Sequence, residues 1–265
     1  MKLDLTFDPP IMNAAGALGF APDLHSAPDR PGLGAFLTNP ISAGPRRPAQ
    51  GVRYLSFAGG FLLHTGFPNP GIRAATKHFA STWKRSPIPV YVHLLCQNPA
   101  QLRKMVAHLE ASGAVSGIEL GISPRISPSA ALQFIQQAVG ELPVIVRLPL
   151  ERATELAYGI VSLIDANGRQ PDQAKLVPAA FSLGPPRGAL PLAGQGLLRG
   201  RLYGPALFPL ALAALQALRP LGIPLIGAGG VYQDWQIEAM LGAGALAVQL
   251  DSVFWRGSWA ATATQ

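Results

Sequence analysis

The chain has 265 residues, which is the length of one α/β barrel of roughly 250 residues or of two smaller domains. Charged residues make up 13% of the sequence and apolar residues 49%, a balance that excludes an intrinsically disordered chain. The formal net charge of +7 is not gathered into a block of lysine and arginine, so it favours small anionic ligands over nucleic acid.

Cysteine usage and the N-terminal sequence restrict the site chemistry further. Cys96 is the single cysteine, which excludes an intramolecular disulfide framework and any multi-cysteine metal site. No histidine pair or carboxylate cluster has metal-ligand spacing, so we expect no metal. The N-terminus lacks the layout of a signal peptide, and no run of about eighteen apolar residues occurs. We therefore expect a soluble, cytoplasmic protein with no membrane segment.

Short apolar strands alternate with helical segments along the chain, which is the pattern of a parallel sheet. The predicted strands are residues 11–16, 35–38, 89–95, 117–122, 143–148, 174–182, 223–226 and 245–250. The predicted helices are residues 72–83, 99–112, 129–139, 152–167, 205–218 and 233–241. Residues 52–63 carry several glycines and are predicted to be irregular.

These elements predict one domain, residues 1–265, folded as a single (β/α)₈ TIM barrel. The alternative is an open, doubly wound sheet. We favour the barrel because no glycine-rich dinucleotide motif opens the chain. Instead, the glycine turn Gly227, Gly229 and Gly230 comes late, between the last two predicted strands, where barrels commonly hold a phosphate.

Nine segments carry a resemblance to a known family, and they occur in that family's order along almost the whole chain. They are residues 8–20, 37–42, 44–46, 66–71, 118–123, 144–149, 200–206, 224–230 and 243–249. Together they resemble the dihydroorotate dehydrogenases of class 1, which are flavin-bearing barrels. The resemblance implies FMN, oxidation of a CH–CH bond in pyrimidine biosynthesis, and a homodimer or a subunit of a larger complex.

The resemblance also implies positions for the cofactor. Ala14, Ala15 and Gly16 would form a small-residue platform for the flavin ring. Two lysines of the family that contact flavin correspond here to Asn39 and Arg147. The remaining cofactor contacts would be Ser182, Gly204, Gly229, Gly230 and Ser252, the last four around the phosphate.

Asp251 opposes this assignment, because a carboxylate beside a phosphate is repulsive by about 4 kcal/mol at close range. Its side chain is therefore expected to point away from the phosphate or to pair with Arg201.

The substrate side departs from the family pattern. Gly121 and Ile126 replace two substrate-holding asparagines, and Pro124 replaces the catalytic cysteine or serine. A third asparagine corresponds to Leu63 or His64, depending on a one-residue choice of register. Each lost polar partner costs roughly 1–3 kcal/mol, so dihydroorotate itself is not the expected substrate.

Several polar residues remain as candidates for a remodelled site. Ser123 and His64 are the candidate catalytic residues, and Ser123 has a competing interpretation as a turn residue. Together with Gly66 and Asn69 they form the candidate contacts to a small planar or anionic substrate.

Other polar residues have structural interpretations. His93 is interpreted as a packed barrel residue, and Glu119 as the partner of Arg147 in an ion pair. Cys96 is interpreted as an inert thiol.

Two hypotheses about function therefore stand at this point. The first is an FMN-dependent oxidoreductase of the dihydroorotate dehydrogenase type with a remodelled substrate pocket. The second is a non-catalytic barrel of the same family, kept as a binding or subunit scaffold. The retained glycines and Arg147 favour the first hypothesis, and Pro124, Gly121, Asn39 and Asp251 favour the second.

Overall fold

Eight parallel strands form a barrel in the computed structural model, which describes residues 5–23, 32–166, 177–194 and 196–255. They are β1 (Ile11–Asn13), β2 (Phe36–Leu37), β6 (Val90–Leu95), β7 (Gly117–Gly121), β8 (Val144–Pro149), β9 (Ala180–Gly184), β12 (Leu225–Ala228) and β13 (Ala245–Leu250). Their order is β1-β13-β12-β9-β8-β7-β6-β2, and a short β3 (Ile41–Ser42) also pairs with β6. The predicted barrel is confirmed, and each predicted strand overlaps an observed one.

The side chain of Asn13 closes the seam between the first and last strands of that order. Its Oδ1 accepts from the backbone N–H of Leu37 at 2.9 Å, and its Nδ2 donates to the carbonyl of Leu37 at 2.6 Å. A backbone bridge between Met12 and Ala35 continues the pairing. The seam is therefore held partly by one amide side chain, because β1 and β2 are too short for a full ladder.

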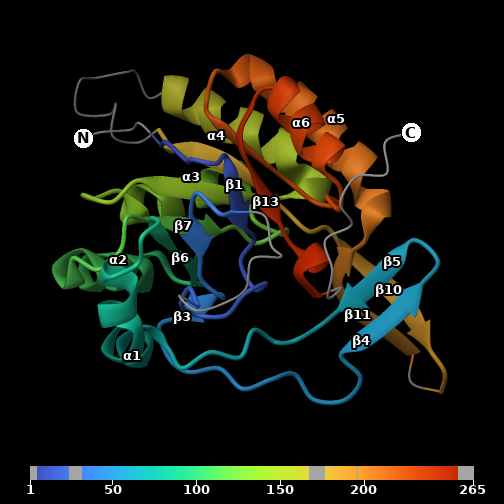
Figure 1. Cartoon of the computed structure of the whole chain (residues 1–265), viewed down its shortest axis with the longest axis horizontal. Helices are drawn as coiled ribbons and strands as arrows, with labels where there is room; N and C mark the ends of the chain where they lie inside the picture. The colour runs from blue at the N-terminus through green and yellow to red at the C-terminus, as the bar shows by residue number, and fades with distance from the viewer. Residues whose placement is uncertain (1–4, 24–31, 167–176, 195, 256–265) are drawn as a thin grey trace.

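Six helices pack on the outside of the barrel (Figure 1). They are α1 (Ile72–Lys84), α2 (Pro99–Ser112), α3 (Pro128–Ala138), α4 (Ala153–Ala166), α5 (Phe208–Leu218) and α6 (Asp234–Gly242). Two of them begin as their sequences predict, since Asn98 and Ser127 cap the N-termini of α2 and α3 with proline at the first helical position. After β13 the chain makes a short 3₁₀ turn, Ser252–Trp255.

The interior of the barrel changes from apolar to polar along the strands, because alternate residues of a strand point inward. Tyr91, Ile145, Ala180 and Ala247 belong to an apolar cluster that also contains Leu5, Phe7 and Met12. The positions two residues further along the same strands are all polar and buried: His93, Arg147, Ser182 and Gln249. The carboxyl-terminal layer of the barrel is therefore the place where polar chemistry gathers.

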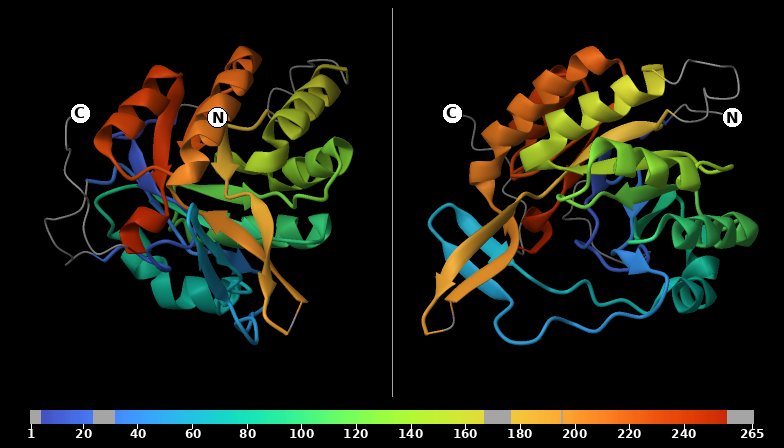
Figure 2. Two further views of the ribbon diagram at one scale, coloured as in Figure 1. Left: turned by 90° about the vertical axis from the view of Figure 1, so that its right-hand side faces the viewer. Right: turned by 180° about the vertical axis from the view of Figure 1, so that it is seen from behind.

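A second sheet of four antiparallel strands lies beside the barrel, in the order β10-β11-β5-β4 (Figure 2). It consists of the hairpins β4 (Tyr54–Phe57) with β5 (Gly60–Leu63) and β10 (Arg187–Leu192) with β11 (Gly196–Tyr203). The prediction that residues 52–63 are irregular is wrong, and the second hairpin was not predicted. Glycines and a proline in these strands hid both hairpins from sequence-based prediction. Gly60 and Gly200 are needed there because a Cβ would lie 2.0 and 2.5 Å from atoms of the neighbouring strand.

Among the described residues, no helix is both long enough and apolar enough to cross a membrane. The end of predicted helix 152–167 and the beginning of predicted strand 174–182 lie outside the described residues.

Candidate functional site

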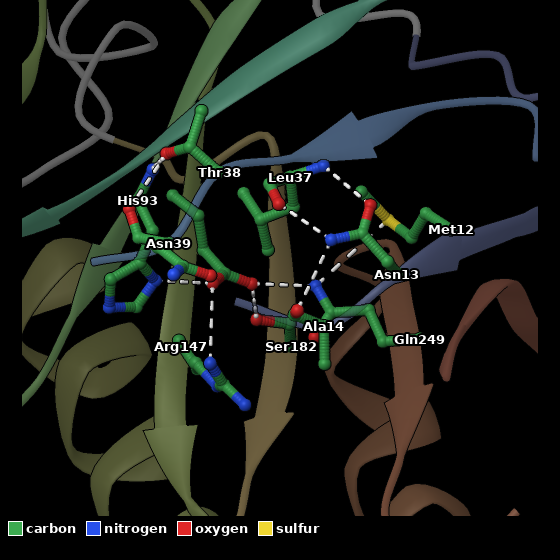
Figure 3. A network of polar contacts seen from close by, with 11 residues as sticks. Met12, Asn13, Ala14, Leu37, Thr38, Asn39, His93, Arg147, Ser182 and Gln249 are labelled. Atoms are coloured by element: carbon green, nitrogen blue, oxygen red, sulfur yellow. Dashed lines mark hydrogen bonds and ion pairs between the residues drawn. The ribbon is translucent and has the colours of Figure 1, made fainter. Parts of the chain in front are cut away.

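Glu119 is the centre of a buried polar network inside the barrel. Its Oε2 lies 2.6 Å from Nδ1 of His93 and 3.8 Å from a guanidinium nitrogen of Arg147. Its Oε1 accepts hydrogen bonds from Ser182 Oγ and Gln249 Nε2, each at 2.7 Å. Figure 3 shows His93, Arg147, Ser182 and Gln249 approaching one another from four strands. The predicted ion pair between Glu119 and Arg147 is present, but His93 is the closer partner.

The network fixes the charge states of its members. Burial raises the pKa of Glu119, but the charge of Arg147 and the hydrogen bonds from His93 and Ser182 outweigh burial, and the pKa falls to about 2. Burial lowers the pKa of His93, and this exceeds the opposing effect of Glu119. Glu119 is therefore ionised and His93 neutral near pH 7. Nδ1–H of His93 then donates to Glu119, and Nε2 keeps its lone pair.

Above this network lies a cavity of about 420 Å³, here called the mouth cavity. Its walls come from the ends of β6, β7, β8 and β9, from the segment before α1, and from the hairpin β10–β11. Its charged and nucleophilic lining residues include Arg46, Arg147, Arg187, Arg201, His93, Ser123 and Cys96. No aspartate or glutamate occurs among the described residues that line it. The mouth cavity is thus a strongly cationic hollow at the catalytic end of the barrel.

Two glycines at strand ends make room for the polar side chains. A Cβ on Gly121 would lie 2.7 Å from Nε2 of His93, so the ring fits only because residue 121 has no side chain. A Cβ on Gly184 would lie 3.1 Å from Nε of Arg147. By the resemblance, Gly121 stands where the family has an asparagine. In this chain the imidazole of His93 occupies the space that a side chain at residue 121 would need.

The arginines of the mouth cavity have few partners. Nε of Arg147 is buried without a hydrogen-bond partner in the part of the chain that is described. Arg201 packs its guanidinium over the ring of Phe67 at 4.0 Å, and burial lowers its pKa to about 10. Within the described ranges, neither Arg187 nor Arg201 forms an ion pair. A guanidinium N–H that is withdrawn from water without an acceptor is costly, which predicts that an anion supplies the missing partner.

The predicted flavin platform does not face the mouth cavity. Ala14 and Ala15 are buried, and Gly16 takes a φ of +97° in the turn after β1. The Oδ1 of Asn39 accepts from the backbone N–H of Gly19 at 3.1 Å, so its side chain holds that turn. The hydroxyl of Ser182 donates a hydrogen bond to Oε1 of Glu119.

At the predicted phosphate position the donors of Ser252 are satisfied within the chain. The carboxylate of Asp251 accepts from both the backbone N–H and the hydroxyl of Ser252, the latter at 2.8 Å. The hydroxyl of Tyr232 lies 2.6 Å from Ser252 Oγ. Among the described residues no ion pair joins Asp251 to Arg201, so that expected alternative is wrong. Asp251 instead turns back onto the residue that follows it.

The glycines of this region are explained by contacts within the chain. A Cβ on Gly204 would lie 2.4 Å from the carbonyl oxygen of Gly59, and one on Gly230 would lie 2.4 Å from the backbone nitrogen of Phe208. Gly229 has a φ of +109°. Close backbone packing and left-handed turns therefore require these glycines without any phosphate.

These observations test whether the residues fit FMN. A phosphate needs free N–H and hydroxyl donors, and those of Ser252 are taken by a buried carboxylate that would also repel it. The mouth cavity, which contains Arg147, shares no lining residue with the cavity that contains Gly204 and Ser252. In this arrangement Asp251 and Ser252 do not fit an FMN phosphate.

The predicted substrate and catalytic residues separate in space. Ser123 lines the mouth cavity, where its Oγ accepts from the backbone N–H of Arg125 at 3.4 Å, as its turn interpretation predicts. His64 follows β5 and is not part of the mouth cavity lining. Oδ1 of Asn69 accepts hydrogen bonds from the backbone N–H groups of Ser42 and Gly71, so the side chain links two loops. A Cβ on Gly66 would lie 2.7 Å from the backbone nitrogen of Ala49, so this position requires glycine.

Sequence reasoning missed four basic residues of the cavity as site residues: Arg46, His93, Arg187 and Arg201. The spacing of His93 and Glu119 gave no signal, because they come together only through the register of β6 and β7. Arg187 and Arg201 reach the cavity from the hairpin that was not predicted.

A family model described as dihydroorotate dehydrogenase matches residues 2–159. The catalytic subunit of dihydroorotate dehydrogenase B (NAD(+)) from Pelobacter propionicus is 27% identical over 258 residues, covering 91% of this chain and 82% of its own. The protein of the same description from Methanopyrus kandleri is 30% identical over 267 residues, covering 91% and 80%. A putative dihydroorotate dehydrogenase A (fumarate) from Aeropyrum pernix is 26% identical over 260 residues, covering 92% and 82%. The chain therefore belongs to the dihydroorotate dehydrogenase family.

Proposed function

We propose that this protein is a single-domain, cytoplasmic barrel that binds a small, multiply anionic molecule in the mouth cavity. The observation that carries the proposal is the lining, in which four arginines face the cavity and no described lining residue is acidic. Arg147 and Arg201 are the principal anchors, because Nε of the buried Arg147 has no hydrogen-bond partner and the partly buried Arg201 has no ion-pair partner among the described residues. A bidentate carboxylate or phosphate would satisfy the fork of donors that each guanidinium presents.

The proposal is tested by calorimetry at low salt with malonate, citrate and inorganic phosphate, using uncharged malonamide as the control ligand. We expect the anions to bind and malonamide not to bind. Arg201→Gln and Arg147→Gln should each weaken binding about 10-fold or more, the effect of losing a charge-assisted hydrogen bond. Arg103→Gln, on the exposed face of α2, is the matched control and should change nothing. Equal binding of malonamide, or no binding of any anion, would contradict the proposal.

A second candidate function is an FMN-dependent oxidoreductase of the dihydroorotate dehydrogenase type with a remodelled substrate pocket. Family membership and the unpartnered Nε of Arg147, at the position of a flavin-contacting lysine, favour it. FMN would require Asp251 to release Ser252, so that Gly204, Gly229, Gly230 and Ser252 could hold the phosphate. A yellow purified protein that releases FMN would support this candidate over simple anion binding.

Dihydroorotate is not the expected substrate of either function, because Gly121, Pro124 and Ile126 replace its polar partners and the base. Arg152 fixes this loop by donating to the carbonyls of Pro124 and Ile126 at 2.7 and 2.9 Å. A loop that is held in this way and has no base also favours the second hypothesis, a non-catalytic barrel that serves as a binding or subunit scaffold. Because two of the relatives are described as catalytic subunits, a partner subunit or a homodimer is part of this proposal.

A further inference from the structure

We infer that His93 is the proton acceptor of the mouth cavity, positioned by Glu119, and that the bound anion is a carbon acid. Such a ligand carries a removable C–H next to a carboxylate or carbonyl. The inference rests on the proposed anion binding, since that binding would bring the C–H to the imidazole. It gives the cavity a catalytic base, which Pro124, at the position of the family's catalytic cysteine or serine, cannot be.

The geometry assigns distinct tasks to the two ring nitrogens. Nδ1 is taken by Glu119 at 2.6 Å, and the backbone of His93 is fixed by a hydrogen bond to Thr38 Oγ1 at 3.2 Å. Nε2 has no hydrogen-bond partner among the described residues, and it lies on the Gly121 side of the ring, where His93 lines the mouth cavity. A carboxylate that orients an imidazole for proton transfer through its other nitrogen is a recurring catalytic arrangement.

The arrangement can carry a balanced proton transfer without any further reactant. The C–H bond breaks, its proton goes to Nε2 of His93, and its electron pair stays on the ligand as an enolate. Glu119 stabilises the imidazolium, and Arg147 stabilises the enolate oxygen. When the imidazolium has traded this proton for one from solvent, reprotonation of the same carbon gives hydrogen exchange, and protonation of another carbon gives isomerisation.

Three charged groups and burial determine when His93 is in its basic form. Glu119 on β7 favours the imidazolium, whereas Arg147 on β8 and Arg201 on β11 oppose it, and burial opposes it most. Thr38 contacts only the backbone of His93. The neutral, basic ring therefore predominates at pH 7, and the rate of proton transfer should rise with pH and level off below pH 7.

The first experiment tests the position of Nε2 without any substrate. In a Cys96→Ser background, the protein is treated with bromoacetate, a small anionic alkylating agent, and the modified histidines are located by mass spectrometry. We expect His93 to be alkylated about 10-fold faster than the exposed His78, because the arginines concentrate the anion. Malonate should protect His93, and neutral iodoacetamide should show no such preference. An unmodified His93 in protein whose His78 is fully modified would overturn the inference.

The second experiment tests the proton transfer itself. Malonate, oxaloacetate and L-dihydroorotate are first tested for binding, and each one that binds is followed by NMR for loss of its C–H protons in D₂O. The native protein should exchange them about 100-fold faster or more than His93→Asn, which keeps a donor towards Glu119 and lacks Nε2. Melting curves check that the variant is folded.

The two proposals fail in different ways. If an anion binds but the native protein and His93→Asn exchange its protons equally, His93 is not a base, and the anion-binding proposal stands. If no anion binds, the proposed function fails, while bromoacetate still decides whether Nε2 faces the cavity. Glu119→Gln should shift the midpoint of the exchange profile to lower pH, which a purely structural role of Glu119 would not do.

Discussion

Two buried carboxylates stand at opposite sides of the barrel mouth, and their surroundings differ. Glu119, on β7, is surrounded by Arg147 and by three hydrogen-bond donors, His93, Ser182 and Gln249, and its pKa is lowered to about 2. Asp251, after β13, accepts hydrogen bonds from Ser252, and burial raises its pKa against the opposing effects of these bonds and of the charge of Arg147. The first carboxylate supports a cationic cavity with an unsatisfied arginine. The second satisfies donors that a ligand would otherwise use.

The comparison indicates that the two sides of the barrel mouth differ in what they can offer a ligand. The mouth cavity still has an unsatisfied arginine donor to offer a ligand, whereas at the β12–β13 end the donors of Ser252 are satisfied by Asp251. Ligand binding and any chemistry are therefore expected on the β6–β8 side.

The largest expected effect comes from Glu119→Gln. The substitution leaves Arg147 without its buried counter-charge and turns an amide towards donors that need an acceptor, which costs about 3–5 kcal/mol. Urea unfolding at pH 7 measures the loss. Glu155→Gln is the control, because Glu155 pairs with Arg152 on the surface and its loss should cost less than about 1 kcal/mol. A cost for Glu119→Gln as small as that of the control would remove the distinction between the two carboxylates.

Asp251→Gly is expected to have the next largest effect, a gain of FMN binding of about 10-fold or more. The substitution frees the N–H and hydroxyl of Ser252 and removes a repulsion worth about 4 kcal/mol at close range. Quenching of flavin fluorescence measures the affinity. Riboflavin, which lacks the phosphate, is the control ligand and should gain nothing. Native protein that already prefers FMN to riboflavin would show that Asp251 does not close this end.

The barrel could be predicted from sequence because its eight strands are short, mostly apolar segments, most of them separated by helices, and each is recognisable within ten residues. The polar network could not be predicted, since Glu119 meets Ser182 and Gln249 across 63 and 130 residues. Gly121 was interpreted as a loss of function, although its missing side chain is what admits His93. The phosphate turn was predicted from glycines that packing within the chain also requires. Sequence reasoning placed Asp251 correctly as the residue in conflict with a phosphate, but not its bond to Ser252.

His93→Asn should flatten the acid side of the stability profile. Because the pKa of His93 is lowered in the fold, the unfolded chain binds the proton more tightly. Stability is therefore complete above the ordinary pKa of 6.5 and falls as the pH drops from there towards the lowered value. Each unit of lowering contributes about 1.4 kcal/mol to this loss. Urea unfolding from pH 7.5 to 4.5 measures it, with the exposed His78→Asn as control. An unchanged slope in His93→Asn would place the buried, neutral ring in doubt.

The smallest expected effect is that of Asp251→Asn, a stabilisation of about 1 kcal/mol or less at pH 7. The amide oxygen still accepts from Ser252, and the variant has no buried charge. Because the pKa of Asp251 is raised in the fold, the protonated form gives full stability below pH 3.8, and this stability is lost as the pH rises through the raised value. The advantage of the variant should accordingly vanish below pH 3.8, which urea unfolding at pH 7 and pH 3.5 tests. If Asp251→Asn instead destabilises the protein at pH 7, the charge of Asp251 supports Arg147 across the mouth. The two carboxylates would then share one role.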